Sequence, residues 1–277
     1  EALAEPLAPA RALGTFNGKA FDAPLLVTRY AMHSIPCPFA DFAHLDLLPL
    51  ARRLWRDRLP SRALKYLEEN VLMAPRTAEE VPGYEIPYLY FDYLRTGDAG
   101  PLKGIFYHNA MDIVALAALT SHVAAVLQDP FAGRVRHGQD FVALAMLFEE
   151  LGKWDLAARL YEHGLESHAS AGSAQRLPEA DFWEAVRRLS RLQRRRGDLG
   201  MAVRLWEQAA AQGHVYAHVE LAKYYEHHAR DAAAALAWTR KAKALVAELD
   251  IPRYEYHHWM EELDHREKRL QGKSAGG

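Results

Sequence analysis

A short run of residues that ends at an Asn-Gly pair, followed closely by a proline, is the feature that most constrains the fold of this chain. Residues 13–16 form the run, and Asn17 and Gly18 break it, which predicts a buried strand that stops at a turn. Proline is tolerated only in the first turn of a helix, so Pro24 predicts a helix that begins close to Asp22. Strand, turn and helix in this order indicate an α/β domain.

Asp22 has two interpretations. It can cap the predicted helix, because an aspartate at this position accepts a backbone N–H, and the spacing alone favours that role. It can also be half of an acidic metal site, with His108 and Asp112 as the other half. His108 and Asp112 are four residues apart at the expected start of a long apolar helix, so both can point the same way. A histidine and an aspartate there can also merely complement the helix dipole.

The rest of the first half predicts further elements. Residues 42–48 indicate a second strand containing Asp46, which is expected to be a turn or strand-end aspartate rather than a third metal ligand. A helix should follow at residues 50–58, and Ser61 should cap another through residue 72. The apolar positions of the long helix predict one buried side, at Ile113, Leu116, Thr120, Val123 and Leu127.

An aromatic run, Tyr88-Leu89-Tyr90-Phe91, lies between these elements. Such rings can stack on bases. They lead directly into Leu94, however, so we favour packing in a core.

The composition limits the kind of partner and compartment. The net charge is −2, so any polyanion must be held locally rather than by the overall charge. The single cysteine excludes an internal disulfide and a multi-cysteine metal site, which favours a reducing compartment. We found no apolar run of about 18 residues and no leader pattern, so we expect a cytoplasmic protein that does not bind a membrane.

Three ordered motifs resemble a known family. They are Phe16-Asn17-Gly18 through Phe21-Asp22-Ala23-Pro24-Leu25, His44-Leu45-Asp46-Leu47-Leu48-Pro49, and His108-Asn109 through Asp112-Ile113. Together they are similar to the YprB-type ribonuclease H-like family, which is related to the DEDD 3′–5′ exonucleases. The likeness covers about residues 10–128. It implies a metal-dependent nuclease that acts on nucleic acid, with a single-stranded end as the expected substrate.

The resemblance also implies roles for particular residues. In DEDD enzymes an Asp-x-Glu pair and two further aspartates bind two divalent metals, Mg²⁺ or Mn²⁺. Asp22 matches the second-motif acid and Asp112 the third-motif acid. His108 falls where many relatives have tyrosine and would position or deprotonate the attacking water. We also predict that Asn17 and Phe21, from the same motif as Asp22, bind the substrate.

The first-motif pair is missing from this chain. No aspartate is followed two residues later by glutamate. In the family the pair lies on an upstream strand, and residues 1–13 have the pattern of a helix tail, so we expect an N-terminal truncation that removes the first strands. Two carboxylates and a histidine are a poor cage for a hard cation. We therefore expect the chain alone to be inactive, or else to be a non-catalytic scaffold that binds nucleic acid or protein.

The second half predicts helical repeats. Small residues recur seven positions apart in three segments: Ala157 with Gly164, Ala202 with Ala209, and Ala235 with Ala242. The last two segments are spaced 33 residues apart, close to the ~34 of tetratricopeptide repeats. The longer first gap is explained by an insertion at residues 168–178.

We therefore expect an incomplete ribonuclease H-like domain at residues 1–130 and a tetratricopeptide-like α-helical domain at residues 131–277, which could bind a protein partner. An arginine-rich helix in the second domain, residues 187–196, has two interpretations. It can be a solvated repeat face, which we favour, or a basic surface that guides a nucleic-acid strand.

Overall fold

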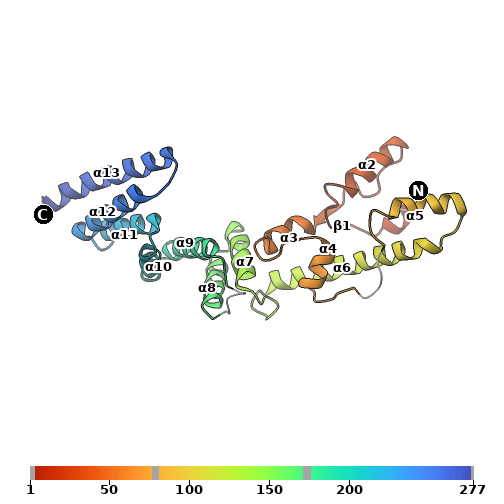
Figure 1. The fold of residues 1–277 in the computed structure, drawn as a ribbon, viewed down its shortest axis with the longest axis horizontal. Coiled ribbons are helices and arrows are strands. Elements are labelled where there is room, and N and C mark those ends of the chain that lie inside the picture. The colour runs from red at the N-terminus through yellow and green to blue at the C-terminus, as the bar shows by residue number, and fades with distance from the viewer. Residues whose placement is uncertain (1–3, 77–80, 171–175, 276–277) are drawn as a thin grey trace. The chain divides into compact units, whose positions relative to one another are not determined.

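The computed structural model describes residues 4–76, 81–170 and 176–275, which form two compact units, Glu1–Ala143 and Leu144–Gly277 (Figure 1). The division falls later than the expected boundary at residue 130. Helix α7, Gly138–Glu150, begins in the first unit, where Asp140 is paired with Arg58 at an Nε–Oδ1 distance of 2.7 Å. This nearly buried ion pair attaches the start of α7 to the first unit.

The first unit combines a small parallel sheet with helices. Its elements are α1 (Ala4–Leu7), β1 (Ala12–Thr15), α2 (Asp22–Met32), β2 (Ala43–Asp46), α3 (Leu47–Trp55), α4 (Leu64–Asn70), α5 (Ile86–Thr96), the short 3₁₀ helix η1 (Gly100–Leu102) and α6 (Lys103–Gln128). Among the described residues the sheet has two strands, and Thr15 of β1 pairs with Asp46 of β2. Both predicted strands are present, but β1 is not buried as predicted, since its residues alternate between exposed and half-buried. Strand β2 is shorter than expected because Leu47 already begins α3.

Two predicted helix starts are wrong. Ser61 does not cap α4: its hydroxyl accepts the N–H of Ala63, and the helix begins one residue later at Leu64. The long helix α6 begins at Lys103 rather than near Asn109. His108 and Asp112 therefore lie within α6 rather than at its N-terminus, so the interpretation that they complement a helix dipole no longer applies.

The buried side of α6 also differs from the prediction. Helix α6 packs against α4, and its buried residues are Ala115, Leu119, Val123 and Val126. Ile113, which was predicted to be buried, is 68% exposed. The helix is apolar on nearly every side, so its periodicity could not identify the packed side.

The first unit exposes much apolar surface. Neither α2 nor α5, whose residues are all described, buries any residue. In α5 the aromatic side chains Tyr88 and Phe91 are 71% and 66% exposed, and in α2 Leu25 is 71% exposed. The prediction that the aromatic run packs in a core is therefore wrong for this structure. Surface of this kind is typical of an interaction site.

By length and composition, residues 100–128 form a helical stretch that could cross a membrane. Its most apolar 18-residue window has a mean hydropathy of 1.8 and is 22% buried. The expectation that no such stretch exists was wrong. His122 and the hydroxyl residues around it are polar but uncharged, so they lower the mean hydropathy of the helix only a little. The core helices of other proteins reach the same length and hydropathy.

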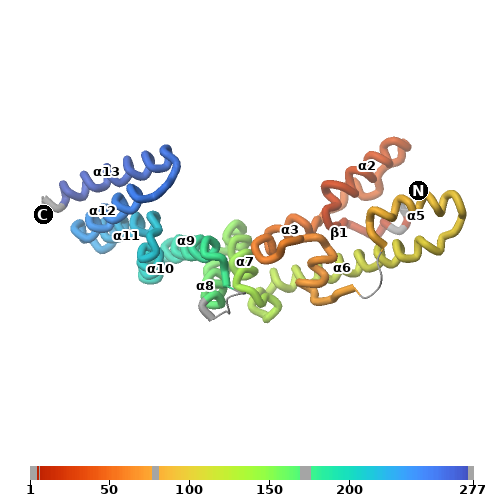
Figure 2. The backbone as a smooth tube through the Cα atoms, viewed as in Figure 1, coloured from red at the N-terminus to blue at the C-terminus, as the bar shows by residue number. Residues whose placement is uncertain are grey.

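The second unit consists of helices that pack on their neighbours in chain order. They are the end of α7, α8 (Trp154–Ser170), α9 (Glu179–Arg196), α10 (Leu199–Ala211), α11 (Val215–His227), α12 (Ala232–Glu248) and α13 (Arg253–Ala275) (Figure 2). The small residues singled out in the three sequence segments are all buried, because close helix packing leaves no room for larger side chains. Part of the predicted insertion, residues 171–175, lies outside the described residues.

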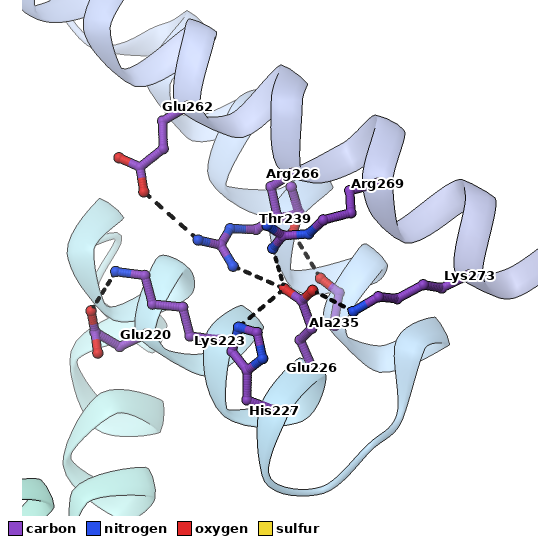
Figure 3. Close-up of polar contacts among 10 residues, drawn as sticks. All are labelled: Glu220, Lys223, Glu226, His227, Ala235, Thr239, Glu262, Arg266, Arg269 and Lys273. Atoms are coloured by element: carbon purple, nitrogen blue, oxygen red, sulfur yellow. Dashed lines mark hydrogen bonds and ion pairs between the residues drawn. The ribbon is translucent and has the colours of Figure 1, made fainter.

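A buried carboxylate ties α11 to α13 (Figure 3). The side chain of Glu226 is 1% exposed and accepts hydrogen bonds from Arg266 at 3.1 Å, Arg269 at 2.7 Å and Lys273 at 3.0 Å. Burial alone would raise the pKa of Glu226, but the hydrogen bonds from Lys273 and Arg269, together with nearby His227, hold it below the ordinary value. Beside them, Val219, Ala242, Val246 and Leu263 form a buried apolar cluster from α11, α12 and α13.

Candidate functional site

Asp46 fixes the turn that follows β1. Its carboxylate Oδ1 accepts the backbone N–H of Asn17 at 2.7 Å and of Leu48 at 3.1 Å, and Oδ2 accepts the N–H of Lys19 at 2.9 Å. Burial would raise the pKa of Asp46, but these three bonds and nearby His44 lower it overall. Asp46 is therefore a strand-end aspartate, as the sequence predicted, and it also caps α3.

The turn places Asn17 in a rare backbone conformation. Asn17 has a φ of 67°, in the left-handed region that asparagine tolerates better than most residues. Gly18 is buried, and a Cβ added to it would lie 2.5 Å from Cβ of Thr15. The Asn-Gly pair is thus required by a tight turn whose N–H groups point at Asp46.

Asp22 is the first residue of α2, and Phe21 occupies the N-cap position without a side-chain capping bond. The interpretation of Asp22 as the N-cap is therefore wrong. Asp22 is exposed, and Phe21 is 68% exposed beside it. Both side chains are accessible to a ligand, but their roles as metal ligand and substrate contact stay predictions.

His108 and Asp112 lie in contact on successive turns of α6. The distance from His108 Nε2 to Asp112 Oδ2 is 3.4 Å, and the two side chains are 32% and 39% exposed. The predicted juxtaposition of these residues is confirmed, because residues four apart on a helix share one side.

Arg76 joins the pair and was missed in the sequence. Its Nη2 donates to Asp112 Oδ1 at 2.6 Å, and its Nε donates to Glu68 Oε2 at 2.7 Å. Nη1 lies 3.4 Å from His108 Nδ1. The Arg76 side chain is 1% exposed and that of Glu68 5%. No periodic pattern marks Arg76, which follows Pro75 in a segment assigned only as loop.

The apolar wall beside Arg76 belongs to a pocket of about 340 Å³. Leu72 and Pro75 line one side, and Met111, Val114 and Ala118 of α6 line the other. The buried guanidinium is thus placed at the edge of an open apolar hollow.

These residues do not form a two-metal site by themselves. Among the described residues, no group of three His, Cys, Asp or Glu side chains could hold a metal ion, so Asp22 does not join His108 and Asp112 in such a cluster. Arg76 already neutralises one oxygen of Asp112. A hard divalent cation prefers about six oxygen ligands. The donor set therefore does not fit the implied two-ion centre without further groups.

The arginine-rich helix α9 uses most of its charge in contacts between helices. Arg188 donates to Glu184 at 2.7 Å and to Glu149 at 3.2 Å, while Arg194 pairs with Glu220. The guanidinium of Arg195 lies 3.3 Å from the centre of the Trp154 ring. These contacts stabilise neighbouring helices, so α9 is neither a simple solvated face nor an uninterrupted basic surface.

Comparison with known proteins agrees with the first unit's motifs. Residues 1–124 match the RNase_H superfamily, which supports a ribonuclease H-like domain at the N-terminal end. The chain is also 32% identical, over 229 residues, to the uncharacterized protein YprB of Bacillus subtilis (strain 168). That alignment covers 81% of this chain and 52% of the relative, so the chain spans about half the length of the curated relative it matches. No solved structure matches the chain.

Proposed function

We propose that this chain is part of a metal-dependent nuclease, a 3′–5′ exonuclease that acts on single-stranded ends of nucleic acid. The observation that carries the proposal is the contact between His108 and Asp112 on α6, within residues that match the RNase_H superfamily. A histidine held beside a carboxylate is suited to orienting a water or taking its proton.

In this proposal Asp22 and Asp112, which the structure does not bring into one cluster, would be two of the ligands of Mg²⁺ or Mn²⁺, and Asn17 and Phe21 would contact the substrate. The exposure of Asp22 and Phe21 supports these roles. The remaining carboxylates, an Asp-x-Glu pair, would come from a segment outside this chain, and Arg76 would have to release Asp112 Oδ1 for that carboxylate to hold a cation. The chain alone is inactive.

The exposed apolar side chains of α2, α5 and α6 support the same proposal. A parallel sheet is normally covered on both faces, and a two-stranded one is too small to be stable without support. We propose that the segment that supplies the acidic pair packs on this surface. The surface is then part of a domain core, and α6 belongs to a protein interior rather than to a bilayer, in a cytoplasmic protein.

The test compares two proteins with the same substrates. This chain, and a version extended by the upstream coding sequence, are each given Mg²⁺ or Mn²⁺ and end-labelled single-stranded DNA and RNA. We expect the extended protein to degrade these substrates and this chain not to degrade them. Asp112→Ala should lower the degradation rate of the extended protein more than the loss of an outer-shell partner does, which is typically about 10–100-fold. Equal degradation by the Asp112→Ala variant would show that the proposed site is wrong.

A second candidate function is that of a non-catalytic scaffold, favoured by the ion pair between Arg76 and Asp112. In that case the upstream sequence also lacks Asp-x-Glu, and binding to nucleic acid or protein is the activity. Under either function we assign protein binding to the second unit, as tetratricopeptide-like helical hairpins. Reading the upstream coding sequence separates the two candidates, because only the nuclease requires the acidic pair.

A further inference from the structure

A small pocket in the second unit lies between α9, α10, α11 and α13. It has a volume of about 160 Å³, below the roughly 300–1,000 Å³ of sites for whole small molecules. Trp206, Tyr216 and Trp259 supply aromatic walls, and Arg187 and Arg191 of α9 stand at its edge. A pocket of this size accommodates one side chain or one terminal group of a larger ligand.

Two hydrogen-bond donors on residues that line this pocket have no partner among the described residues. The indole Nε1 of Trp206 and the hydroxyl of Tyr216 are both buried atoms without a hydrogen bond. Trp206 as a whole is 2% exposed. Leaving such a group unsatisfied destabilises the folded state, and native proteins contain few of them. Burial raises the pKa of Tyr216 to about 12, so its hydroxyl keeps its proton at neutral pH.

Among the described residues, the ion pairs of Arg187 and Arg191 are long, whereas Arg194, which also lines the pocket, is paired closely with Glu220. Arg187 is 3.8 Å from Glu184, and Arg191 is 3.9 Å from Glu149, while both side chains are about half exposed. By contrast, Lys223 is held by Glu220 at 2.9 Å. Arg187 and Arg191 are four residues apart and share one side of α9. The guanidinium of Arg187 lies 5.3 Å from the centre of the Tyr216 ring, which keeps it beside the pocket.

We propose that this pocket binds the side-chain carboxylate of a Glu or Asp residue in an acidic polypeptide segment. The indole N–H and the tyrosine hydroxyl donate to its oxygens, and Arg187 and Arg191 pair with its charge, a geometry for which guanidinium groups are well suited. The neighbouring apolar residue of the peptide packs on the aromatic walls. This proposal rests on the protein-binding role given to the second unit and is independent of the nuclease proposal.

The charges around the pocket favour a peptide over a nucleic acid. Glu220 and Glu262 line it, and Glu184 and Glu149 lie beside its arginines. A nucleic-acid strand needs a continuous series of cations along its phosphates, and these four acids interrupt any such series. A single carboxylate needs only the guanidiniums of Arg187 and Arg191, and Glu220 is itself paired with Arg194 and Lys223.

The experiment uses the full chain labelled with ¹⁵N and follows the indole N–H resonance of Trp206, assigned by its loss in Trp206→Phe. The probes are a blocked hexapeptide with two adjacent glutamates beside a phenylalanine, its glutamine counterpart, and a single-stranded oligothymidylate. We expect the glutamate peptide to shift the Trp206 resonance downfield in a saturable way. The glutamine peptide should bind at least about tenfold more weakly, as expected for losing a charge-assisted hydrogen bond.

Matched variants locate the site. Arg191→Gln should weaken binding of the glutamate peptide about tenfold, and Tyr216→Phe should weaken it while leaving the Trp206 resonance observable. Arg195→Gln removes the same charge from the same helix, but its guanidinium stacks on Trp154, so we expect no effect.

Two outcomes overturn the proposal. One is a Trp206 resonance that no peptide moves, or that only the oligothymidylate moves. The other is equal binding by the Arg191→Gln and Arg195→Gln variants. A peptide that binds elsewhere on the second unit without moving the Trp206 resonance is a case of the first outcome, and it leaves the wider protein-binding role intact.

Discussion

The guanidinium of Arg76 contacts the carboxylate of Asp112 at 2.6 Å, although Arg76 lies in a loop and Asp112 lies within α6. The same guanidinium also contacts Glu68 of α4 at 2.7 Å. One buried cation therefore connects two helices and the proposed catalytic pair. The charge of Asp112 in this structure is balanced by the protein itself.

Replacing Arg76 with methionine should destabilise the first unit by about 3–5 kcal/mol, because it leaves Glu68 buried without its cation. Hydrogen exchange of the backbone amides in α4 and α6 measures the change. The double variant with Glu68→Met should recover most of the loss, since both charges are then removed. As a control, Arg95→Met removes an exposed partner of Asp92 and should change stability by less than about 0.5 kcal/mol. Unchanged hydrogen exchange in the Arg76→Met variant would contradict the buried ion pair between Arg76 and Glu68.

Asp46→Asn should weaken the turn after β1 by about 1–3 kcal/mol at pH 7, because an amide cannot accept all three backbone N–H groups. The pKa of Asp46 is lowered in the folded state. Its contribution to stability is therefore present above the unfolded pKa of about 3.9 and is lost as the pH falls through the lower, folded value. Urea unfolding should show the difference between wild type and Asp46→Asn shrinking below about pH 4. A difference that is constant with pH would contradict this role of the carboxylate.

Local patterns predicted the elements around Asp46 and Asp22 well. The Asn-Gly break and Pro24 located β1, its turn and α2, because backbone conformation there depends on the residues themselves. The same reasoning failed for Ser61 and for the buried side of α6. A serine hydroxyl can bond to several nearby N–H groups, and a helix that is apolar all round has no polar side to orient it.

The candidate site could be predicted only where its members share one helix. His108 and Asp112 were paired correctly because four residues span about one turn. Arg76 comes from a loop 32 residues before His108 in the chain, and its position depends on tertiary packing against Glu68. The orphan donors of Trp206 and Tyr216 are likewise invisible in the sequence, since their lack of partners depends on four helices at once.

Gly18→Ala should destabilise the first unit by about 1–3 kcal/mol, the usual effect of overpacking. The added Cβ would lie 2.5 Å from Cβ of Thr15, and that atom cannot move without moving β1. Gly14→Ala is the matched control, because nothing lies within 4 Å of its added Cβ. We expect Gly14→Ala to be neutral or slightly stabilising. Thermal unfolding followed by circular dichroism compares the two, and equal midpoints would show that the turn is looser than the structure indicates.

Glu226→Gln should destabilise the second unit by about 3–5 kcal/mol. The side chain is 1% exposed and accepts from three cations, so the substitution leaves Arg266, Arg269 and Lys273 close together without their common anion. Hydrogen exchange in α11 and α13 reports the loss of their contact. Asp155→Asn is the control, because its carboxylate is 85% exposed and pairs only at the surface with Arg196.

The pH dependence of Glu226→Gln gives an independent check. The folded pKa of Glu226 is lowered, so the stability that it contributes is present above the unfolded value of about 4.3 and is lost as the pH falls through the folded value. The glutamine variant has no carboxylate to protonate. Its stability should therefore approach that of the wild type at acid pH, and an undiminished gap at pH 3 would mean that the cations are held by other groups.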